Sequence, residues 1–356
     1  MAFLSYKNIR VSGLSVGVPK SKICNLDIKD ISEDYDAASF VEVTGVKERR
    51  IGELTVSDLA VPAACKLLED LGWEKSEIDG LVVVTQHGDY IVPATSCILQ
   101  DKIGLNKECM ALDISLGCSG WVYGLSVLAG MMNNGCMRKC LLVCGDARRR
   151  VEFNDPLFGF AATVTALEYK EGEEGFRFHL GTDGSGYDAI IIPDGGARNQ
   201  ITESSFVPQE IDGRKYTPLQ SRMKGMDVFS FGITTAPKSV KKLAEHFGFD
   251  YSSYDYLVLH QANMKMNRMI AKKLKFDMEK VPSSMWNFGN TSSASIPLTI
   301  TTQLKDCCTK GSVNLLCCGF GVGLSWGTVA LQVDRIVIPE LVEVEEKNII
   351  NNCNLN

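Results

Sequence analysis

Apolar residues repeat every three or four positions in two distant segments of the chain, residues 59–71 and 240–247. The repeating positions are Leu59, Ala63, Leu67 and Leu71 in the first segment and Val240, Leu243 and Phe247 in the second. This spacing predicts two amphipathic helices. A polar turn and a short apolar run follow each of them, at residues 81–84 and 257–260, and each run predicts a buried strand.

The two helices belong to a longer internal repeat. Residues 71–84, "LGWEKSEIDGLVVV", align without a gap with residues 247–260, "FGFDYSSYDYLVLH". Two further pairs follow in the same order: residues 115–125 with 287–297, and residues 141–145 with 315–319. Each half is expected to run helix, strand, loop, strand ending in Gly-Cys or Gly-Asn, helix, strand. Repetition in the same order and at nearly the same spacing indicates a duplication.

The order of the elements predicts the fold class. Alternating strands and helices favour mostly parallel sheets that are covered by helices. Two such halves predict a five-layered α/β/α/β/α architecture with a pseudo-twofold axis. We expect an N-terminal half at residues 1–185, a C-terminal half at residues 186–340 and a variable tail at residues 341–356.

Composition narrows the class of protein. Hydrophobic residues make up 45% of the 356 residues and charged residues 22%, which is an ordinary globular profile. The net charge of −6 and the lack of a basic block argue against nucleic-acid binding. No apolar run reaches the roughly 18 residues of a membrane span, and the start of the chain lacks the apolar core of a signal peptide. The thirteen cysteines are therefore expected as free thiols in a reducing cytoplasm. Their spacing does not predict a metal site.

Cys118 differs from the other cysteines, most of which are expected to be small core residues. It lies between a predicted strand at residues 112–115 and a helix that begins with small residues. Gly117 and Gly120 leave the approach to its side chain open. The partial positive charge at a helix start favours a thiolate, so we expect a lowered pKa for Cys118. The pattern predicts a nucleophile.

Two polar residues and a glycine-rich turn are the other candidates for an active site. His260 ends an apolar strand, so its imidazole is expected to be exposed at the edge of a sheet, where sites form in open α/β folds. The other three histidines are expected in a loop, a strand and a helix: His87, His179 and His246. Asn290, which aligns with Cys118 in the repeat, could cap a helix or donate a hydrogen bond to a developing enolate. Residues 317–327, "CCGFGVGLSWG", predict a strand–turn–strand whose backbone N–H groups could face an oxyanion.

These motifs together resemble the thiolase superfamily and, more narrowly, the β-ketoacyl-acyl-carrier-protein synthase III family. The resemblance covers about residues 9–333 and rests on "TGVKERRI" (44–51), "GCSGWVYGL" (117–125), "TDGSGYDAIIIP" (182–193), "HQAN" (260–263), "NFGNTSSASIPL" (287–298) and "GFGVGLSWG" (319–327). It implies that Cys118 carries an acyl group and that the N–H groups of Cys118 and Val322 form an oxyanion hole. It also implies that His260 and Asn290 bind the thioester carbonyl of a malonyl extender. Decarboxylation would then give a carbanion that attacks the acyl carbonyl and forms a 3-ketoacyl thioester.

The resemblance also implies the partners and the outer parts of the site. Acyl-carrier protein or its pantetheine arm would bind at Lys265, Gly225 and Arg268, and Val92 and Phe160 would line the acyl pocket. Family members are typically homodimers in which the second subunit closes that pocket. The substrates are thioesters of coenzyme A or phosphopantetheine, and no metal or redox cofactor is expected.

The sequence departs from the family pattern in the region that grips coenzyme A. The family often has a tryptophan and an arginine before the "TG" motif, where this chain has Ser39 and Val43, with Phe40 adjacent. The loss of a charged phosphate contact favours a carrier-protein donor. The family's "FGDGAGA" is "FGFAATV" here, at residues 158–164, which predicts a reshaped pocket wall or dimer contact. A basic, helix-spaced face suits an acidic carrier protein, although a solvated surface helix would look the same; it comprises Lys265, Arg268, Lys272 and Lys273.

Two other functions share most of these features. One is transfer of an acyl group from carrier protein to a hydroxyl or amine without formation of a carbon–carbon bond. The presence of Asn290 favours condensation, because simple transfer has less need of a donor that stabilises an enolate. The other is a non-catalytic partner subunit, against which the complete set of Cys118, His260 and Asn290 argues. A thiolase proper would need a second cysteine near the site, where this chain has Asn290.

Overall fold

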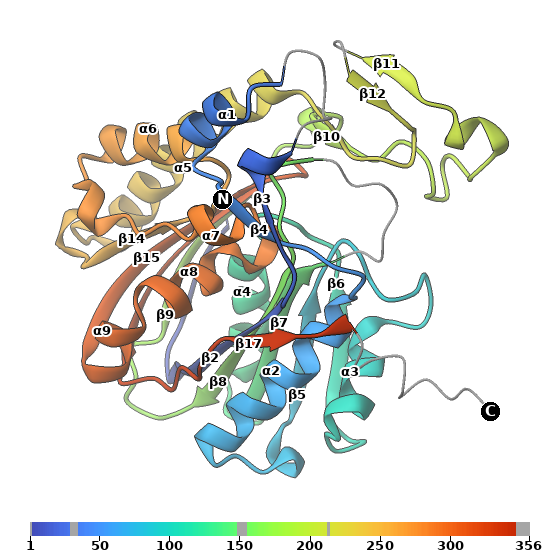
Figure 1. The fold of residues 1–356 in the computed structure, drawn as a ribbon. Helices are drawn as coiled ribbons and strands as arrows, with labels where there is room; N and C mark the ends of the chain where they lie inside the picture. The colour runs from blue at the N-terminus through green and yellow to red at the C-terminus, as the bar shows by residue number, and fades with distance from the viewer. Residues whose placement is uncertain (1, 29–34, 148–154, 212–213, 347–356) are drawn as a thin grey trace, which may run out of the picture.

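The computed structural model describes residues 2–28, 35–147, 155–211 and 214–346, and its core consists of two mixed sheets (Figure 1). The six-stranded sheet has the order β17 (Val342–Val344), β2 (Ile9–Pro19), β8 (Ala161–Tyr169), β7 (Lys139–Asp146), β5 (Gly80–Val84) and β6 (Met110–Ile114). The five-stranded sheet has the order β1 (Ala2–Tyr6), β9 (Phe176–Thr182), β16 (Ser325–Asp334), β15 (Ser312–Gly321) and β14 (Tyr256–Leu259). Strands β7, β5 and β6 are mutually parallel, as are β14 and β15. Their carboxyl ends therefore carry the loops in which a site is expected.

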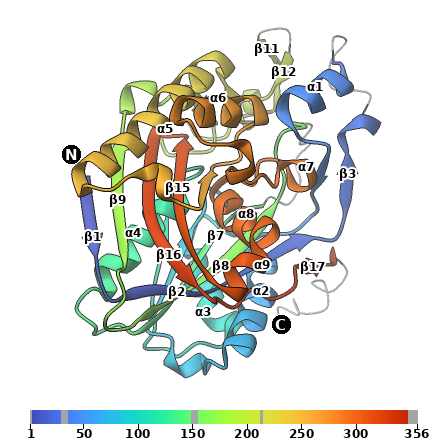
Figure 2. The same cartoon turned by 90° about the vertical axis from the view of Figure 1, so that its left-hand side faces the viewer.

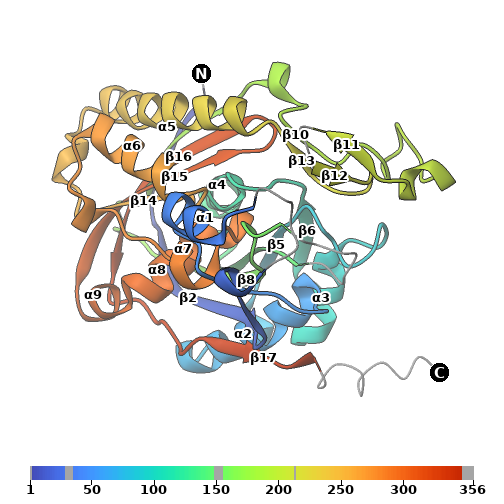
Figure 3. The same ribbon diagram turned by 45° about the horizontal axis from the view of Figure 1, so that its top comes forward.

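Helices form the other three layers. The central helices α4 (Gly120–Met132) and α8 (Ser295–Gln303) contact strands of both sheets. Neither contains a charged residue, and a helix that is apolar on most sides is stable only when it is buried. Helices α2 (Val56–Leu71) and α3 (Thr95–Ile103) cover the outer face of the six-stranded sheet. Helices α5 (Gly225–Phe247) and α6 (Met264–Leu274) cover the five-stranded sheet (Figure 3). The predicted five-layered architecture is confirmed.

Shorter elements complete the fold, and several of them are labelled in Figure 2. They are α1 (Ala37–Thr44), α7 (Met285–Phe288), α9 (Lys305–Lys310), β3 (Lys22–Cys24), β4 (Glu48–Arg50), β10 (Ile190–Ile191), β11 (Gln209–Ile211), β12 (Arg214–Tyr216) and β13 (Arg222–Met223). No helix of the described part of the chain is both long enough and apolar enough to cross a membrane. All twelve cysteines that the structure describes are free, and seven of them are buried, in agreement with their expected role as core residues.

The predicted amphipathic helices owe their boundaries to local chemistry. Helix α2 begins with a capping box in which Thr55 and Asp58 bond each other's backbone N–H groups, and it ends at Gly72, whose φ is 64°. Its apolar face is buried at Leu59, Ala63 and Leu67, as predicted. Helix α5 likewise ends at a left-handed glycine, Gly248, and buries Val240 and Leu243.

The duplication holds for most elements but fails before Asn290. The sequence alignment predicts a strand there, equivalent to β6, and this prediction is wrong, because the short helix α7 occupies the position. Pro282 cannot donate to a strand ladder, and the hydroxyl of Ser283 and the N–H of Ser284 bond instead to Oε1 of Gln261, at 3.0 and 3.1 Å. Asn290 itself forms only an isolated bridge with Phe158.

Strands are also shared across the expected division of the chain. Strands β1 and β9 precede residue 185, yet both belong to the sheet built mostly from the second half. In the expected tail, β17 pairs in parallel with β2, and Glu343 forms an ion pair of 2.8 Å with Arg50. The chain after residue 341 therefore contributes an edge strand, while the division at residue 185 stays a prediction.

Candidate active site

The three predicted catalytic residues line one cavity of about 300 Å³. Cys118 follows β6, His260 follows β14, and Asn290 lies in the connection that leads to α8. Both halves of the chain thus contribute side chains at the carboxyl ends of parallel strands, where the fold class predicts a site. None of the three side chains is open to bulk solvent, because Cys118 is 9% exposed, His260 1% and Asn290 5%.

Glycine residues of β15 allow this strand to pass directly against Cys118. A Cβ atom at Gly321 would lie 2.6 Å from Sγ of Cys118, and one at Gly319 would lie 2.9 Å from the Cys118 carbonyl oxygen. The predicted strand–turn–strand is confirmed, since β15 and β16 pair in antiparallel register with the turn between Gly321 and Ser325. The hydroxyls of Ser119 and Ser325, 2.7 Å apart, join the nucleophile segment to this hairpin.

The acidity of Cys118 differs from the sequence expectation. A lowered pKa was expected from the helix start, but burial raises the pKa of the thiol to about 11, and the nearby carboxylate of Asp146 also raises it. The N–H groups of Val322 and of Cys118 itself donate to the sulfur and act in the opposite direction. The two amides expected to form the oxyanion hole therefore lie at the nucleophile, which is a protonated thiol at neutral pH.

His260 is buried rather than exposed at the sheet edge, so that part of the expectation is wrong. Its backbone N–H donates to the Cys318 carbonyl at 2.9 Å. Its ring lies edge-on to that of Phe320, with the ring centroids 5.7 Å apart. Burial lowers the pKa of His260 to about 3, which keeps the imidazole neutral at physiological pH. Nδ1 is 2.7 Å from the Ser295 hydroxyl. Since Nδ1 is engaged, Nε2 is the ring nitrogen left for a ligand.

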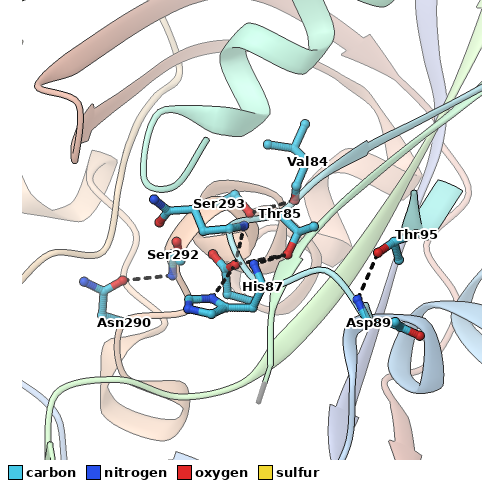
Figure 4. A network of polar contacts seen from close by, with 10 residues as sticks. Val84, Thr85, His87, Asp89, Thr95, Asn290, Ser292 and Ser293 are labelled. Carbon is cyan, nitrogen blue, oxygen red and sulfur yellow. Dashed lines mark hydrogen bonds and ion pairs between the residues drawn. The ribbon is translucent and has the colours of Figure 1, made fainter. Parts of the chain in front are cut away.

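Asn290 is held in place by local hydrogen bonds, and the first role considered for it, capping, is seen in part. Its Oδ1 accepts a hydrogen bond of 2.9 Å from the N–H of Ser292 and so caps the turn before α8 (Figure 4). Its backbone is fixed on both sides, because its N–H donates to Leu157 and its carbonyl accepts from Gly159. With Oδ1 occupied, the Nδ2 hydrogens are the part of the amide that can serve a ligand in the cavity.

The outer site residues expected from the resemblance divide into two groups. Gly225 and Phe160 line the same cavity as the catalytic residues. Lys265 and Arg268 are exposed on α6 and do not line it. Val92 does not line it either: it is 80% exposed, in the loop between β5 and α3. The expectation that Val92 lines the acyl pocket therefore does not hold for the pocket of a single chain.

The departures from the family pattern fall around the cavity. On α1, Phe40 lines the cavity, whereas Ser39 and Val43 are exposed to solvent. Of residues 158–164, the first three form part of the cavity wall and the rest enter β8. The segment just before them, residues 148–154, lies outside the described residues.

A polar pair in the cavity was not recognised from the sequence. Asp146, the last residue of β7, accepts through Oδ1 from the Thr85 hydroxyl at 3.1 Å and from the Gln86 N–H at 2.8 Å. Nδ1 of His87 lies 3.1 Å from the same oxygen. His87 was expected to be an ordinary loop residue. The rule that singled out His260, a polar residue just after a buried strand, would also have identified His87.

Comparisons with known proteins find relatives along most of the chain. Two family models fit the chain: "3-Oxoacyl-[acyl-carrier-protein (ACP)] synthase III" at residues 112–184 and the C-terminal model of the same synthase at residues 244–333. A beta-ketoacyl-[acyl-carrier-protein] synthase III of Clostridium acetobutylicum is 31% identical over 334 residues, which cover 91% of this chain and 98% of that protein. One of Alkalilimnicola ehrlichii is 31% identical over 330 residues, with 91% and 98% covered. The crystal structure of a 3-oxoacyl-(acyl-carrier protein) synthase from Burkholderia xenovorans LB400 superposes with a TM-score of 0.87 at 34% identity, covering 97% of this chain and 99% of that one.

Proposed function

The chain belongs to the 3-oxoacyl-[acyl-carrier-protein] synthase III family, and from this premise we propose how its residues carry out a decarboxylative condensation. It is an enzyme that joins an acyl group to a malonyl thioester. The balanced reaction consumes an acyl thioester, a malonyl thioester and one proton. It releases a 3-ketoacyl thioester, carbon dioxide and the free thiol of the acyl donor.

The first half-reaction transfers the acyl group to Cys118. Its sulfur attacks the thioester carbonyl, the bond to the donor sulfur breaks, and the proton of the cysteine thiol leaves on that sulfur. Charge develops on the carbonyl oxygen in the transition state, and the N–H groups of Cys118 and Val322 are proposed to donate to it. Both amides already lie at Sγ. Their positions are fixed by the tight contact between Cys118 and β15.

The second half-reaction forms the carbon–carbon bond. Nε2 of His260 and Nδ2 of Asn290 are proposed to donate to the thioester carbonyl of the malonyl group. Loss of carbon dioxide then leaves an enolate whose charge these two donors stabilise. The described residues that line the cavity include no lysine or arginine, so no such cation holds the malonyl carboxylate there. The enolate carbon attacks the acyl carbonyl on Cys118, and the released thiolate takes up a proton.

The observation that carries this proposal is the state of the donors beside Cys118. We assign the Ser295 hydroxyl as the donor to Nδ1 of His260, 2.7 Å away, which places the imidazole hydrogen on Nε2. Asn290 uses Oδ1 internally and keeps Nδ2 free. Two donors fixed in this way suit an enolate oxygen. An acyl transfer to a hydroxyl or amine would require a base instead, and His260, whose pKa is about 3, is a weak one.

The test separates the two half-reactions. Acylation of Cys118 is followed by intact-protein mass spectrometry with an acyl thioester alone. Decarboxylation is followed as release of ¹⁴CO₂ from labelled malonyl-carrier protein. Wild-type protein that becomes acylated, but transfers the acyl group only to water or added alcohols and amines, would refute condensation and support acyl transfer.

Acyl-carrier protein is proposed as the partner that delivers the thioesters. Lys265, Arg268 and Lys272 are spaced by three and four residues on α6 and are all exposed, which gives one basic face. A carrier protein with an acidic surface would be attracted to this face. Reversing the charges with Lys265→Glu and Arg268→Glu should raise KM for acyl-carrier protein and leave KM for the corresponding acyl-CoA nearly unchanged.

A homodimer and a cytoplasmic location complete the proposal. The loop with Tyr90, Ile91 and Val92 exposes 65%, 98% and 80% of these side chains, so it offers apolar surface to a second subunit. Light scattering on the purified protein tests the dimer. The free thiols of the described cysteines support a reducing compartment. The proposed chemistry uses thioester substrates and needs no metal or redox cofactor.

A further inference from the structure

Two polar side chains in the cavity take no part in the condensation. His87 follows β5 and Asp146 ends β7, and these strands lie next to each other in the sheet whose neighbouring strand β6 leads to Cys118. Both residues line the same cavity as the nucleophile. An acyl group attached to Cys118 therefore shares this cavity with His87 and Asp146.

The pair leaves hydrogen-bonding capacity unused. Oδ1 of Asp146 has three partners, from Thr85, Gln86 and His87. Oδ2 of Asp146 is buried and has no hydrogen-bond partner among the described residues. On His87, Nδ1 faces the carboxylate, and Nε2 is the nitrogen left for a ligand. A buried carboxylate oxygen without a donor is costly, so a ligand that supplies one would be favoured.

The position of Asp146 is also unfavourable for the nucleophile, which points to another role for this residue. Its charge raises the pKa of Cys118, which opposes formation of the thiolate. The structural role of the side chain, anchoring the segment after β5, is fulfilled by Oδ1 alone. Neither the anchoring nor the condensation explains why a carboxylate with a free oxygen is placed beside the nucleophile.

The chemistry of the lining identifies the group that would bind. Asp146 and Asp155 both line the cavity, whereas the described lining residues include no lysine or arginine, so an acyl group that ends in a carboxylate is disfavoured. An ammonium group would need three acceptors, but the pair offers two, Oδ2 of Asp146 and Nε2 of His87. A hydroxyl group has a single donor hydrogen, which Oδ2 can accept.

We propose, building on the condensing function above, that His87 and Asp146 select an acyl donor that bears a hydroxyl group. The hydroxyl donates to Oδ2 of Asp146, and His87 holds the carboxylate in the orientation that receives it. A hydrogen bond to a charged acceptor predicts a preference of at least about tenfold over the same acyl chain without the hydroxyl. Such sites discriminate strongly because a substrate that lacks the hydroxyl leaves the buried acceptor unpaired.

The test compares acyl chains of equal length. The rate of Cys118 acylation is measured by intact-protein mass spectrometry with the carrier-protein and coenzyme A thioesters of butyrate, 3-hydroxybutyrate and 4-hydroxybutyrate. Succinyl and 4-aminobutyryl thioesters serve as charged alternatives. Wild-type protein should acylate at least about tenfold faster with one of the hydroxylated chains than with butyryl. Asp146→Asn keeps Oδ1 for the anchoring bonds, and both it and His87→Leu should reduce this ratio to about one.

A matched control separates loss of the binding site from loss of any carboxylate. Asp250 bonds the N–H and hydroxyl of Ser252 at the surface, so Asp250→Asn removes a comparable charge outside the cavity and should keep the ratio. A wild-type ratio near one, a ratio that both variants preserve, or a preference for the succinyl or aminobutyryl chain would overturn the proposal. If no thioester, butyryl included, acylates Cys118, the proposed condensing function fails instead.

Discussion

Replacing Gly321 with alanine should disable the nucleophile without unfolding the protein. A Cβ atom at this position would lie 2.6 Å from Sγ and 2.5 Å from Cβ of Cys118. Ordinary contact begins at 3.4 Å, so the sulfur and the new methyl group must separate by at least 3.4 − 2.6 = 0.8 Å. The backbone at Gly321 is not left-handed, so alanine adds no φ strain and the effect is purely one of space.

The size of the effect follows from the geometry of attack. A displacement of about 1 Å between reacting groups can cost about 100-fold in rate. Overpacking of this kind lowers the free energy of unfolding by roughly 1–3 kcal/mol, which a domain of this size tolerates. We therefore expect acylation of Cys118 to slow by about 100-fold while the protein stays folded.

The assay is single-turnover acylation, read by intact-protein mass spectrometry, with thermal unfolding measured on the same samples. Gly311→Ala is the matched control, because it lies just before the same strand and its nearest neighbour would be 3.9 Å from the new Cβ. It should acylate at the wild-type rate. Acylation of Gly321→Ala at the wild-type rate, with unchanged unfolding, would refute the claim that the close packing of β15 positions the nucleophile.

Three further predictions concern the chemistry of the site. Because the pKa of Cys118 is about 11, its alkylation by iodoacetamide should accelerate about tenfold for each pH unit from about 7 to 10. A plateau in the alkylation rate near pH 7 would contradict the buried, protonated thiol. Ser295→Ala should slow malonyl decarboxylation about tenfold or more and slow acylation of Cys118 much less, because Nδ1 of His260 loses the partner that fixes the tautomer. Equal slowing of both steps would count against this role of Ser295. Asn290→Ala should likewise reduce release of ¹⁴CO₂ by about 100-fold while acylation persists, and a variant that decarboxylates normally would remove Asn290 from the mechanism.

The sequence was sufficient to predict the elements whose periodicity is strong. Helix α2 and strand β5 follow directly from their apolar spacing, and the duplication correctly brought Cys118, His260 and Asn290 to one cavity. The strand expected before Asn290 was wrong because the alignment there reflects shared glycine and small residues rather than a strand pattern, and Pro282 already argued against it.

Properties that depend on burial were harder to predict. The helix start suggested an acidic thiol at Cys118, but the cost of removing charge from water exceeds the effect of the helix. His260 was expected at an exposed edge and is buried, since β15 and α8 pack around it. The contact between His87 and Asp146 joins residues 59 positions apart, which no local pattern reveals.

The most direct test of the account is intact-protein mass spectrometry on Cys118 through a complete cycle. The protein is incubated with an acyl thioester, the site of modification is mapped, and malonyl-carrier protein is then added. We expect an acyl adduct on Cys118, absent in Cys118→Ala, that malonyl-carrier protein discharges as a 3-ketoacyl product. An adduct on another cysteine, or one on Cys118 that malonyl-carrier protein does not discharge, would contradict the proposed condensation.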